Sequence, residues 1–171
     1  MGTVERVFVA GAGGEAMQAV DAVQAVAGRG LDGDRYATRR GYWTDVDECQ
    51  VTLIRAEDLD EIAASSGVAV QDGQHRRNIV TRGVDLRALT GRTFRIGGAT
   101  FAYDRPRPPC RYVESITEPG MTRALAARRG GICVRVIDSG LVRTGDEIEV
   151  LPVEDGFESV RPGPIHRVPN H

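Results

Sequence analysis

Lysine is absent from this sequence of 171 residues, and all 22 basic residues are arginines. Without lysine the chain cannot form a Schiff base with pyridoxal phosphate, and it cannot supply the lysine of a nucleotide-binding P-loop. Two large classes of enzyme are therefore excluded. The formal net charge of −2 gives no overall basic field, so we expect neither nucleic acid nor a membrane surface as a partner.

Long apolar runs and a cysteine framework are also missing. The sequence has no run of about 18 apolar residues and no secretory signal, so we expect a cytoplasmic protein. Its three cysteines, Cys49, Cys110 and Cys133, are odd in number and widely spaced, which favours reduced thiols over disulfides. The length suits one domain, which we place at residues 1–151, followed by a proline-containing C-terminal tail at 152–171.

Predicted strands outnumber predicted helices. A helix is expected over residues 55–67, where Ala56, Leu59 and Ile62 have helical spacing, and a second over 121–131. Strands joined by turns rather than by helical crossovers predict a mainly β fold of the α+β class, either a sandwich or a barrel. The predicted strands are 4–10, 51–54, 78–80, 93–96, 99–104, 132–137 and 146–151, with glycine turns at 83, 91, 97–98, 140 and 145.

A glycine-rich segment, residues 11–16, follows the first strand and satisfies the relaxed form G-x-G-x-x-[GA] of the dinucleotide fingerprint. A dinucleotide-binding domain also needs an acidic residue at the end of its second strand. Here Asp32 and Asp34 lie in a further glycine-rich turn instead. We therefore interpret residues 11–16 as a glycine turn after an edge strand.

The segment YDRPRPPCRYVE, residues 103–114, surrounds Cys110 with prolines and arginines. The prolines stiffen the backbone and fix the direction of the thiol, while guanidinium groups favour the thiolate, which binds soft metals and attacks sulfur electrophiles. The alternative is a small apolar cysteine at a buried strand end, with its arginines in solvent. The prolines are Pro106, Pro108 and Pro109, and the arginines are Arg105, Arg107 and Arg111.

A second polar cluster is QHRRNIV, residues 74–80. Arg76 and Arg77 suit a phosphate or another anion, and Asn78 can bind the edge of a heterocycle. The alternative is a solvated loop with a turn-forming asparagine. We interpret His75 as a surface histidine rather than an acid or base, and the cysteines lack the C-x-x-C spacing of a zinc site.

Taken in order, several segments of the chain resemble MOSC domains, which are named for the C-terminal domain of molybdenum cofactor sulfurases. The resemblance implies a fold around a β-barrel-like core with mostly antiparallel strands. It also implies that the cysteine of the PC dipeptide, here Cys110, is the metal ligand and the catalytic residue. The segments are GLDGDRYA (30–37), VTLI with the acidic helix after it (51–63), RRNI (76–79), DLRALTGRTFRIGGATF (85–101), RPPC (107–110), RGGI (129–132) and SGLVRTGDEIEV (139–150).

The same resemblance implies a set of cofactor contacts. The RRNI segment corresponds to the place where molybdenum-binding members hold the phosphate or pterin of molybdopterin, and the GLDGDRY loop and RGG turn face the site. Cys49 and Cys133 have no counterpart that we recognise in the family, so we assign them to packing. The predicted contacts are Arg76, Arg77, Asn78, Asp34, Arg35, Gly130 and Gly131, with Arg111 as a flanking cation.

Three functions remain open at this point. In the first, Cys110 binds molybdenum cofactor, and the protein reduces N-hydroxylated small molecules with electrons from a redox partner. Alternatively, Cys110 carries a persulfide received from a separate cysteine desulfurase, which would supply the pyridoxal phosphate that this chain cannot bind covalently. The third possibility is a non-catalytic module that binds an anion, with Cys110 purely structural.

Overall fold

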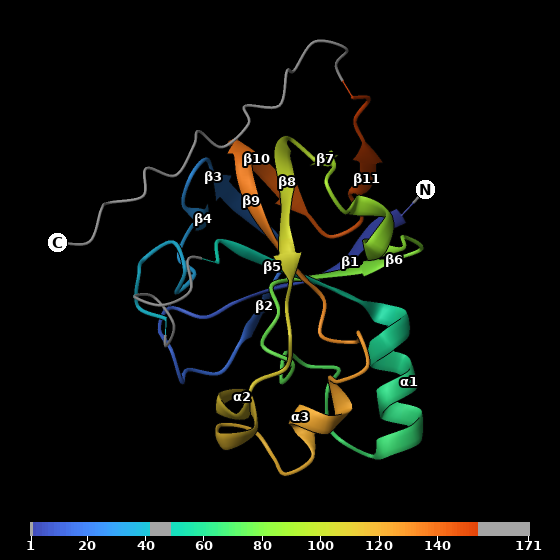
Figure 1. The fold of residues 1–171 in the computed structure, drawn as a ribbon. Helices are drawn as coiled ribbons and strands as arrows, with labels where there is room; N and C mark the ends of the chain where they lie inside the picture. Colours follow the sequence, from blue (N-terminus) through green and yellow to red (C-terminus); the bar gives the residue numbers. More distant parts are fainter. Residues whose placement is uncertain (1, 42–48, 154–171) are drawn as a thin grey trace, which may run out of the picture.

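The computed structural model describes residues 2–41 and 49–153, and its centre is a closed barrel of seven strands (Figure 1). Neighbouring strands of the barrel are antiparallel except β5 and β6, within the part of the chain that is described. The predicted mainly β fold is confirmed. Around the barrel the strands are β1 (Gly2–Val9), β11 (Glu147–Val150), β7 (Thr93–Ile96), β8 (Ala99–Pro106), β9 (Ile132–Asp138), β5 (Val51–Arg55) and β6 (Ile79–Arg82).

Helix α1 (Ala56–Ser66) connects the parallel pair β5 and β6. Parallel neighbours need a long crossover, whereas antiparallel neighbours need only a turn. The helix buries Ala56, Leu59 and Ile62 and ends at Gly67, whose φ of 69° is left-handed. The helix predicted over residues 55–67 is thus confirmed, together with its C-terminal glycine.

A smaller sheet and an extra strand occupy the segments around the glycine-rich turns. Strand β2 (Gln18–Val20) pairs with β1, which also pairs with β6 and β11, so the prediction of an edge strand before residues 11–16 is wrong. The turn predicted at Gly140 is also wrong, because Gly140 begins β10. The smaller sheet is made of β10 (Gly140–Arg143), β3 (Ala22–Val26) and β4 (Gly30–Leu31).

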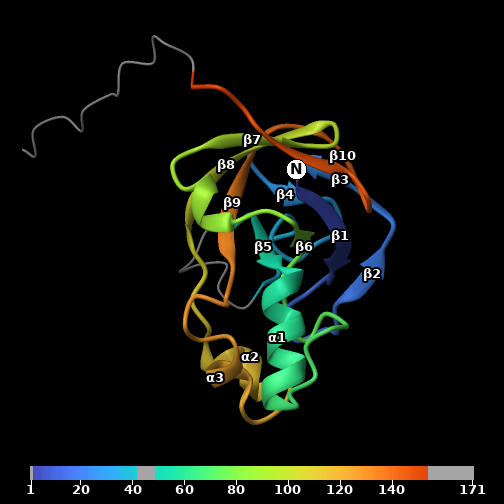
Figure 2. The same ribbon diagram turned by 90° about the vertical axis from the view of Figure 1, so that its right-hand side faces the viewer.

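The helices α1, α2 and α3 gather at one end of the barrel, as two perpendicular views show (Figures 1 and 2). The helix predicted over residues 121–131 is shorter than expected: α3 spans Met121–Ala124, and Ala127 and Arg128 have left-handed φ values of 56° and 66°. No helix in the described part of the chain is long and apolar enough to cross a membrane. The remaining elements are α2 (Arg111–Ser115) and a 3-10 helix, η1 (Leu86–Leu89).

Two apolar clusters form the core. One fills the barrel, where the rings of Phe94 and Phe101 stack with centroids 5.9 Å apart. The other lies between the barrel and the helices, and Cys110 packs against its margin. From Glu154 on, the predicted tail lies outside the described residues, so the division at residue 151 stays a prediction.

Candidate functional site

Cys110 lies at the helical end of the barrel, directly before α2, on extended backbone with φ −134° and ψ 153°. The side chain is partly exposed and opens into a small hollow with a volume of about 20 Å³. Three separate parts of the chain supply arginines to this hollow. We call it the arginine hollow; its lining residues are Arg35, Tyr36, Arg76, Arg77, Arg107, Cys110, Tyr112 and Val113.

Arg77 is fully buried in the arginine hollow and is only partly satisfied. Its Nε donates to the carbonyl oxygen of Gly130 at 2.7 Å, and one terminal nitrogen donates to that of His75 at 3.3 Å. The other terminal nitrogen is buried and has no hydrogen-bond partner among the described residues. Burial, with the nearby Arg107 guanidinium, lowers the pKa of Arg77 to about 10, which leaves it charged at neutral pH.

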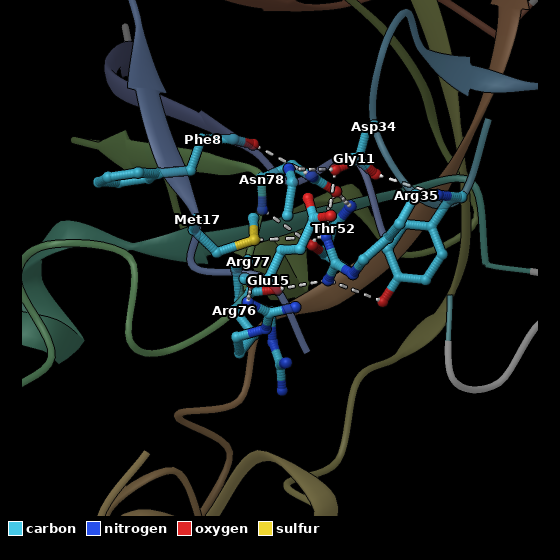
Figure 3. Close-up of polar contacts among 12 residues, drawn as sticks. Phe8, Gly11, Glu15, Met17, Asp34, Arg35, Thr52, Arg76, Arg77 and Asn78 are labelled. Carbon is cyan, nitrogen blue, oxygen red and sulfur yellow. Dashed lines mark hydrogen bonds and ion pairs between the residues drawn. The ribbon is translucent and has the colours of Figure 1, made fainter. Parts of the chain in front are cut away.

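Arg76 repeats this arrangement beside Arg77. One terminal nitrogen donates to the backbone carbonyl of Glu15, and the other is buried without a partner in the described part of the chain (Figure 3). Its φ of 65° is left-handed, which is unfavourable for a residue with a side chain. Burial and the neighbouring Arg35 lower the pKa of Arg76. Two buried cationic donors therefore lack acceptors in one hollow, which is the arrangement an anion satisfies.

Asp34 and Arg35, both predicted contacts, form a buried ion pair at 3.1 Å (Figure 3). The Asp34 carboxylate also accepts hydrogen bonds from the backbone nitrogens of Ala10 and Tyr36 at 3.1 and 3.3 Å. Arg35 donates to the backbone carbonyl of Arg76 at 3.0 Å and to the Tyr36 hydroxyl at 3.3 Å. Both side chains are thus engaged within the protein, and Arg35 connects the pair to the backbone of Arg76.

Asn78 is fully buried and joins three strands (Figure 3). Its side-chain oxygen accepts from the nitrogen and the hydroxyl of Thr52, both at 3.1 Å, and its amide nitrogen donates to the carbonyl oxygen of Phe8 at 3.1 Å. The side chain has no exposed surface from which to meet a ligand in this conformation. We therefore assign Asn78 a positioning role: it anchors the backbone directly after Arg77 to Thr52 and Phe8.

The prediction that His75 lies at the surface is wrong. The ring is completely buried and packs edge-on against Phe8, with ring centroids 5.4 Å apart. Its Nδ1 accepts from the backbone nitrogen of Arg77 at 2.8 Å. Burial, followed by the charges of Arg77 and other arginines, lowers the pKa of His75 to about 3, so the ring is neutral at physiological pH.

The glycines of the RGG turn allow close backbone packing. A Cβ atom on Gly130 would lie 2.3 Å from the carbonyl oxygen of Arg107, and one on Gly131 would lie 2.0 Å from that of Leu53. Both distances are shorter than any real contact, and Gly131 also has a left-handed φ of 84°. Close packing here brings the Gly130 carbonyl to the Nε of Arg77.

Of the three arginines that flank Cys110 in sequence, one lines the arginine hollow. Arg107 does so; Arg111 is exposed and outside it, and Arg105 forms an ion pair with Asp104 at 2.6 Å. Closeness in sequence to Cys110 therefore does not decide which arginines line the hollow. Arg76 and Arg77, more than thirty positions away, supply the buried donors.

A larger cleft of about 870 Å³ meets the arginine hollow at Arg107. The lining of this cleft includes five arginines and three acidic residues, an excess of two positive charges. Within the described residues no group of three or more histidine, cysteine or acidic side chains could hold a metal ion.

Cys49 and Cys133, assigned to packing from the sequence, are both buried, and their sulfur atoms lie 2.8 Å apart. They are separated by 84 positions in the chain. No spacing rule links two cysteines so distant, so the sequence carried no signal for this pair.

Solved structures with similar folds were found, whereas comparison with curated proteins gave no match. The YUAD protein from Bacillus subtilis superposes with a TM-score of 0.69 at 24% identity, covering 88% of this chain and 96% of that one. YiiM from Geobacillus stearothermophilus gives 0.65 at 15% identity, with 91% and 78% covered. YiiM from Escherichia coli gives 0.65 at 18%, with 88% and 70% covered. At these identities the likeness supports the fold alone.

The family model of the MOSC domain matches residues 40–149, which is 110 of the 171 residues. The matched region includes Cys110, the Arg76 and Arg77 pair and the RGG turn. It also contains five of the seven barrel strands completely, together with residues 147–149 of β11. The chain therefore belongs to the MOSC domain family.

Proposed function

We propose that this protein binds molybdenum cofactor through Cys110, with Arg76 and Arg77 holding anionic groups of the cofactor. The observation that carries the proposal is the arginine hollow, where Cys110 lies beside two buried guanidiniums, each with a nitrogen that lacks a partner among the described residues. A soft thiolate suits a sulfur-ligated metal, and the guanidiniums offset the negative charge that thiolate and phosphate would bring.

When bound, the cofactor would supply redox chemistry suited to reducing N-hydroxylated compounds, with electrons from a redox partner. In the chain itself, Cys110 lines the hollow directly before α2, and Arg35 of the buried Asp34–Arg35 pair donates to the backbone carbonyl of Arg76. The hollow has room for about one water-sized group, and the adjoining cleft of about 870 Å³ is of the size that holds a small-molecule ligand.

The test is the molybdenum content of the protein purified from a host that makes the cofactor. We expect bound molybdenum in the wild type and its loss in Cys110→Ala, with a roughly tenfold or larger drop in affinity in Arg77→Met, since a charge-assisted contact contributes about 1.5–3 kcal/mol. Arg143→Met is the matched control, because Arg143 is exposed in β10 and outside the hollow. A wild type without molybdenum, or a content unchanged in Cys110→Ala, would contradict the proposal.

A second candidate function is a sulfur carrier, and the small volume of the arginine hollow favours it. A cavity of about 20 Å³ can accept one added atom on Cys110, and the unpartnered nitrogens of Arg76 and Arg77 would stabilise a persulfide anion. In the transfer, the Cys110 thiolate attacks the outer sulfur of a persulfide on the desulfurase. A new S–S bond forms on Cys110, and the partner's S–S bond breaks to release its thiolate.

Intact mass spectrometry after incubation with a cysteine desulfurase and cysteine tests this function. One additional sulfur is expected on the wild type and none on Cys110→Ser. Extra sulfur on Cys49, or on no cysteine, would contradict the carrier function. Should both tests fail while Cys110→Ser still binds an anion such as phosphate, the arginine hollow would act as a non-catalytic anion-binding module.

A further inference from the structure

We propose that Cys49 and Cys133 form a redox-active dithiol, which a hydroperoxide converts into an intramolecular disulfide. The observation is that their sulfur atoms lie 2.8 Å apart although the residues are 84 positions apart in the chain. This separation exceeds the length of a disulfide bond by only about 0.8 Å. Neither thiol belongs to the arginine hollow, so the proposal does not rest on the function of Cys110.

The barrel holds Cys133 firmly in position. It lies in β9, which pairs with β5 on one side and β8 on the other, and it is opposite Thr52 of β5 and Arg105 of β8. Cys49 lies two positions before β5, and its sulfur is 3.7 Å from the carbonyl oxygen of Val51. Because the barrel already brings the two sulfurs together, closing the bond needs little movement of the backbone.

The surroundings of the pair distinguish the roles of its two sulfurs. The hydrogen bond from Cys49, helped by the charges of Arg107, Arg105 and Arg77, lowers the pKa of Cys133 despite its burial. The same hydrogen bond and burial raise the pKa of Cys49. We assign the first attack to Cys133, whose thiolate the nearby arginines favour, and the resolving step to Cys49.

The reaction consumes one peroxide for each dithiol. The Cys133 thiolate attacks one oxygen of the peroxide, an S–O bond forms, the O–O bond breaks, and the leaving oxygen takes up a proton to become water or an alcohol. Cys49 then attacks the Cys133 sulfur, the S–S bond forms, and the S–O bond breaks and releases one water. Two electrons pass from the thiols to the peroxide. Since both thiols are buried, a small oxidant such as hydrogen peroxide suits the site.

Peptide mapping of the wild-type protein tests the proposal directly. The reduced, folded protein is treated with hydrogen peroxide, denatured, alkylated and digested with trypsin. Without lysine, trypsin cuts only at arginine, and Arg105 and Arg107 precede prolines that block cleavage. The cysteines therefore fall in three separate peptides, 41–55, 96–111 and 130–135. We expect peptides 41–55 and 130–135 to be joined, lighter by two hydrogens than their sum, and to separate again with dithiothreitol.

Variants and an unfolded control complete the experiment. Cys110→Ser should keep the cross-link, whereas Cys49→Ser and Cys133→Ser should lose it. The denatured chain should give mixed pairings, so a single pairing in the native protein reports its geometry. Peptides that remain fully alkylated after peroxide treatment, or cross-links that include Cys110, would overturn the proposal. Because the wild type alone gives this result, a variant that fails to fold does not affect the test.

Discussion

The interior of the barrel and the arginine hollow lie next to each other and are built in opposite ways. Inside the barrel, buried side chains such as Phe94 and Phe101 are apolar, and the strands around them form a closed ring of hydrogen-bonded neighbours. At the hollow, Arg76 and Arg77 are buried, as is His75 behind the backbone of Arg77, and each of the three has a nitrogen without a partner among the described residues. Such groups lower stability by roughly 1–3 kcal/mol each, and more when charged.

This contrast indicates how the protein divides stability and function between two regions. The barrel supplies a large apolar core that tolerates unfavourable groups at one end. The hollow retains buried donors that an anion would satisfy, so ligand binding is expected to stabilise the fold. Substitutions in the barrel and substitutions at the hollow should therefore have effects on stability that differ in magnitude and in pH dependence.

The largest effect is expected inside the barrel. Replacing Phe101 with alanine removes a fully buried ring and leaves a cavity beside Phe94, so the free energy of unfolding should fall by about 3–5 kcal/mol. Denaturant unfolding monitored by circular dichroism measures it. A loss below about 1 kcal/mol would show that the barrel is not the main source of stability.

The next effect is a pH dependence of the free energy of unfolding, which we expect from His75 next to the hollow and not from the apolar interior of the barrel. His75 has a folded-state pKa of about 3 against an ordinary value of 6.5, so between these values the unfolded chain binds a proton that the folded chain does not. The stability of the wild type should therefore fall as pH drops through this window, by about 1.4 kcal/mol per pH unit from this group. His75→Gln removes that contribution. The stability difference between the two proteins should change by about 2 kcal/mol from pH 7 to pH 5; parallel pH curves would contradict the neutral, buried ring.

A smaller effect tests the backbone of the hollow. Arg76 has a left-handed φ of 65°, which glycine adopts without the steric cost that a Cβ atom brings. Arg76→Gly should be more stable than Arg76→Ala by about 1 kcal/mol, although both lose the same guanidinium. Thermal unfolding of the two variants measures the difference. If alanine proved equal to glycine, the backbone strain would be absent in solution.

The smallest effect is expected on the outer surface of the barrel. Arg95 and Glu149 form an ion pair at 3.6 Å, and about half of each side chain is exposed. Arg95→Ala should change the free energy of unfolding by less than about 0.5 kcal/mol, because solvent screens such pairs. A loss of unfolding free energy well above this value would contradict the view that surface arginines contribute little to stability.

Local signals in the sequence predicted the elements whose pattern is regular. Residues 55–67 combine helical spacing with a terminal glycine, and the helix forms there. Residues 22–26 were missed, although alternate residues Val23 and Ala25 are buried as in a half-exposed strand. The helix predicted over 121–131 ends at Ala124, and the chain then adopts left-handed conformations at Ala127 and Arg128. Neither residue is a glycine, so no local signal in the sequence indicated these conformations.

The site was predictable only where its residues are close in sequence or match the family. The proline-flanked Cys110 and the paired Arg76 and Arg77 were recognised, and the structure brings these three side chains to one hollow. The burial of His75 was not, because Phe8, the ring against which it packs, comes from strand β1, far away in the sequence. The contact between Cys49 and Cys133 is a product of barrel closure and has no local pattern.

Barrel closure also has a consequence for synthesis. Strand β1 meets β11 through Gly2 and Thr3, which pair with Ile148 and Glu147. During translation β1 leaves the ribosome long before β11. Until β11 has emerged, one edge of β7 and the start of β1 therefore lack their partner strand. Such open edges bind other strands readily. Translation that stalls before residue 147 would therefore leave a chain prone to aggregation.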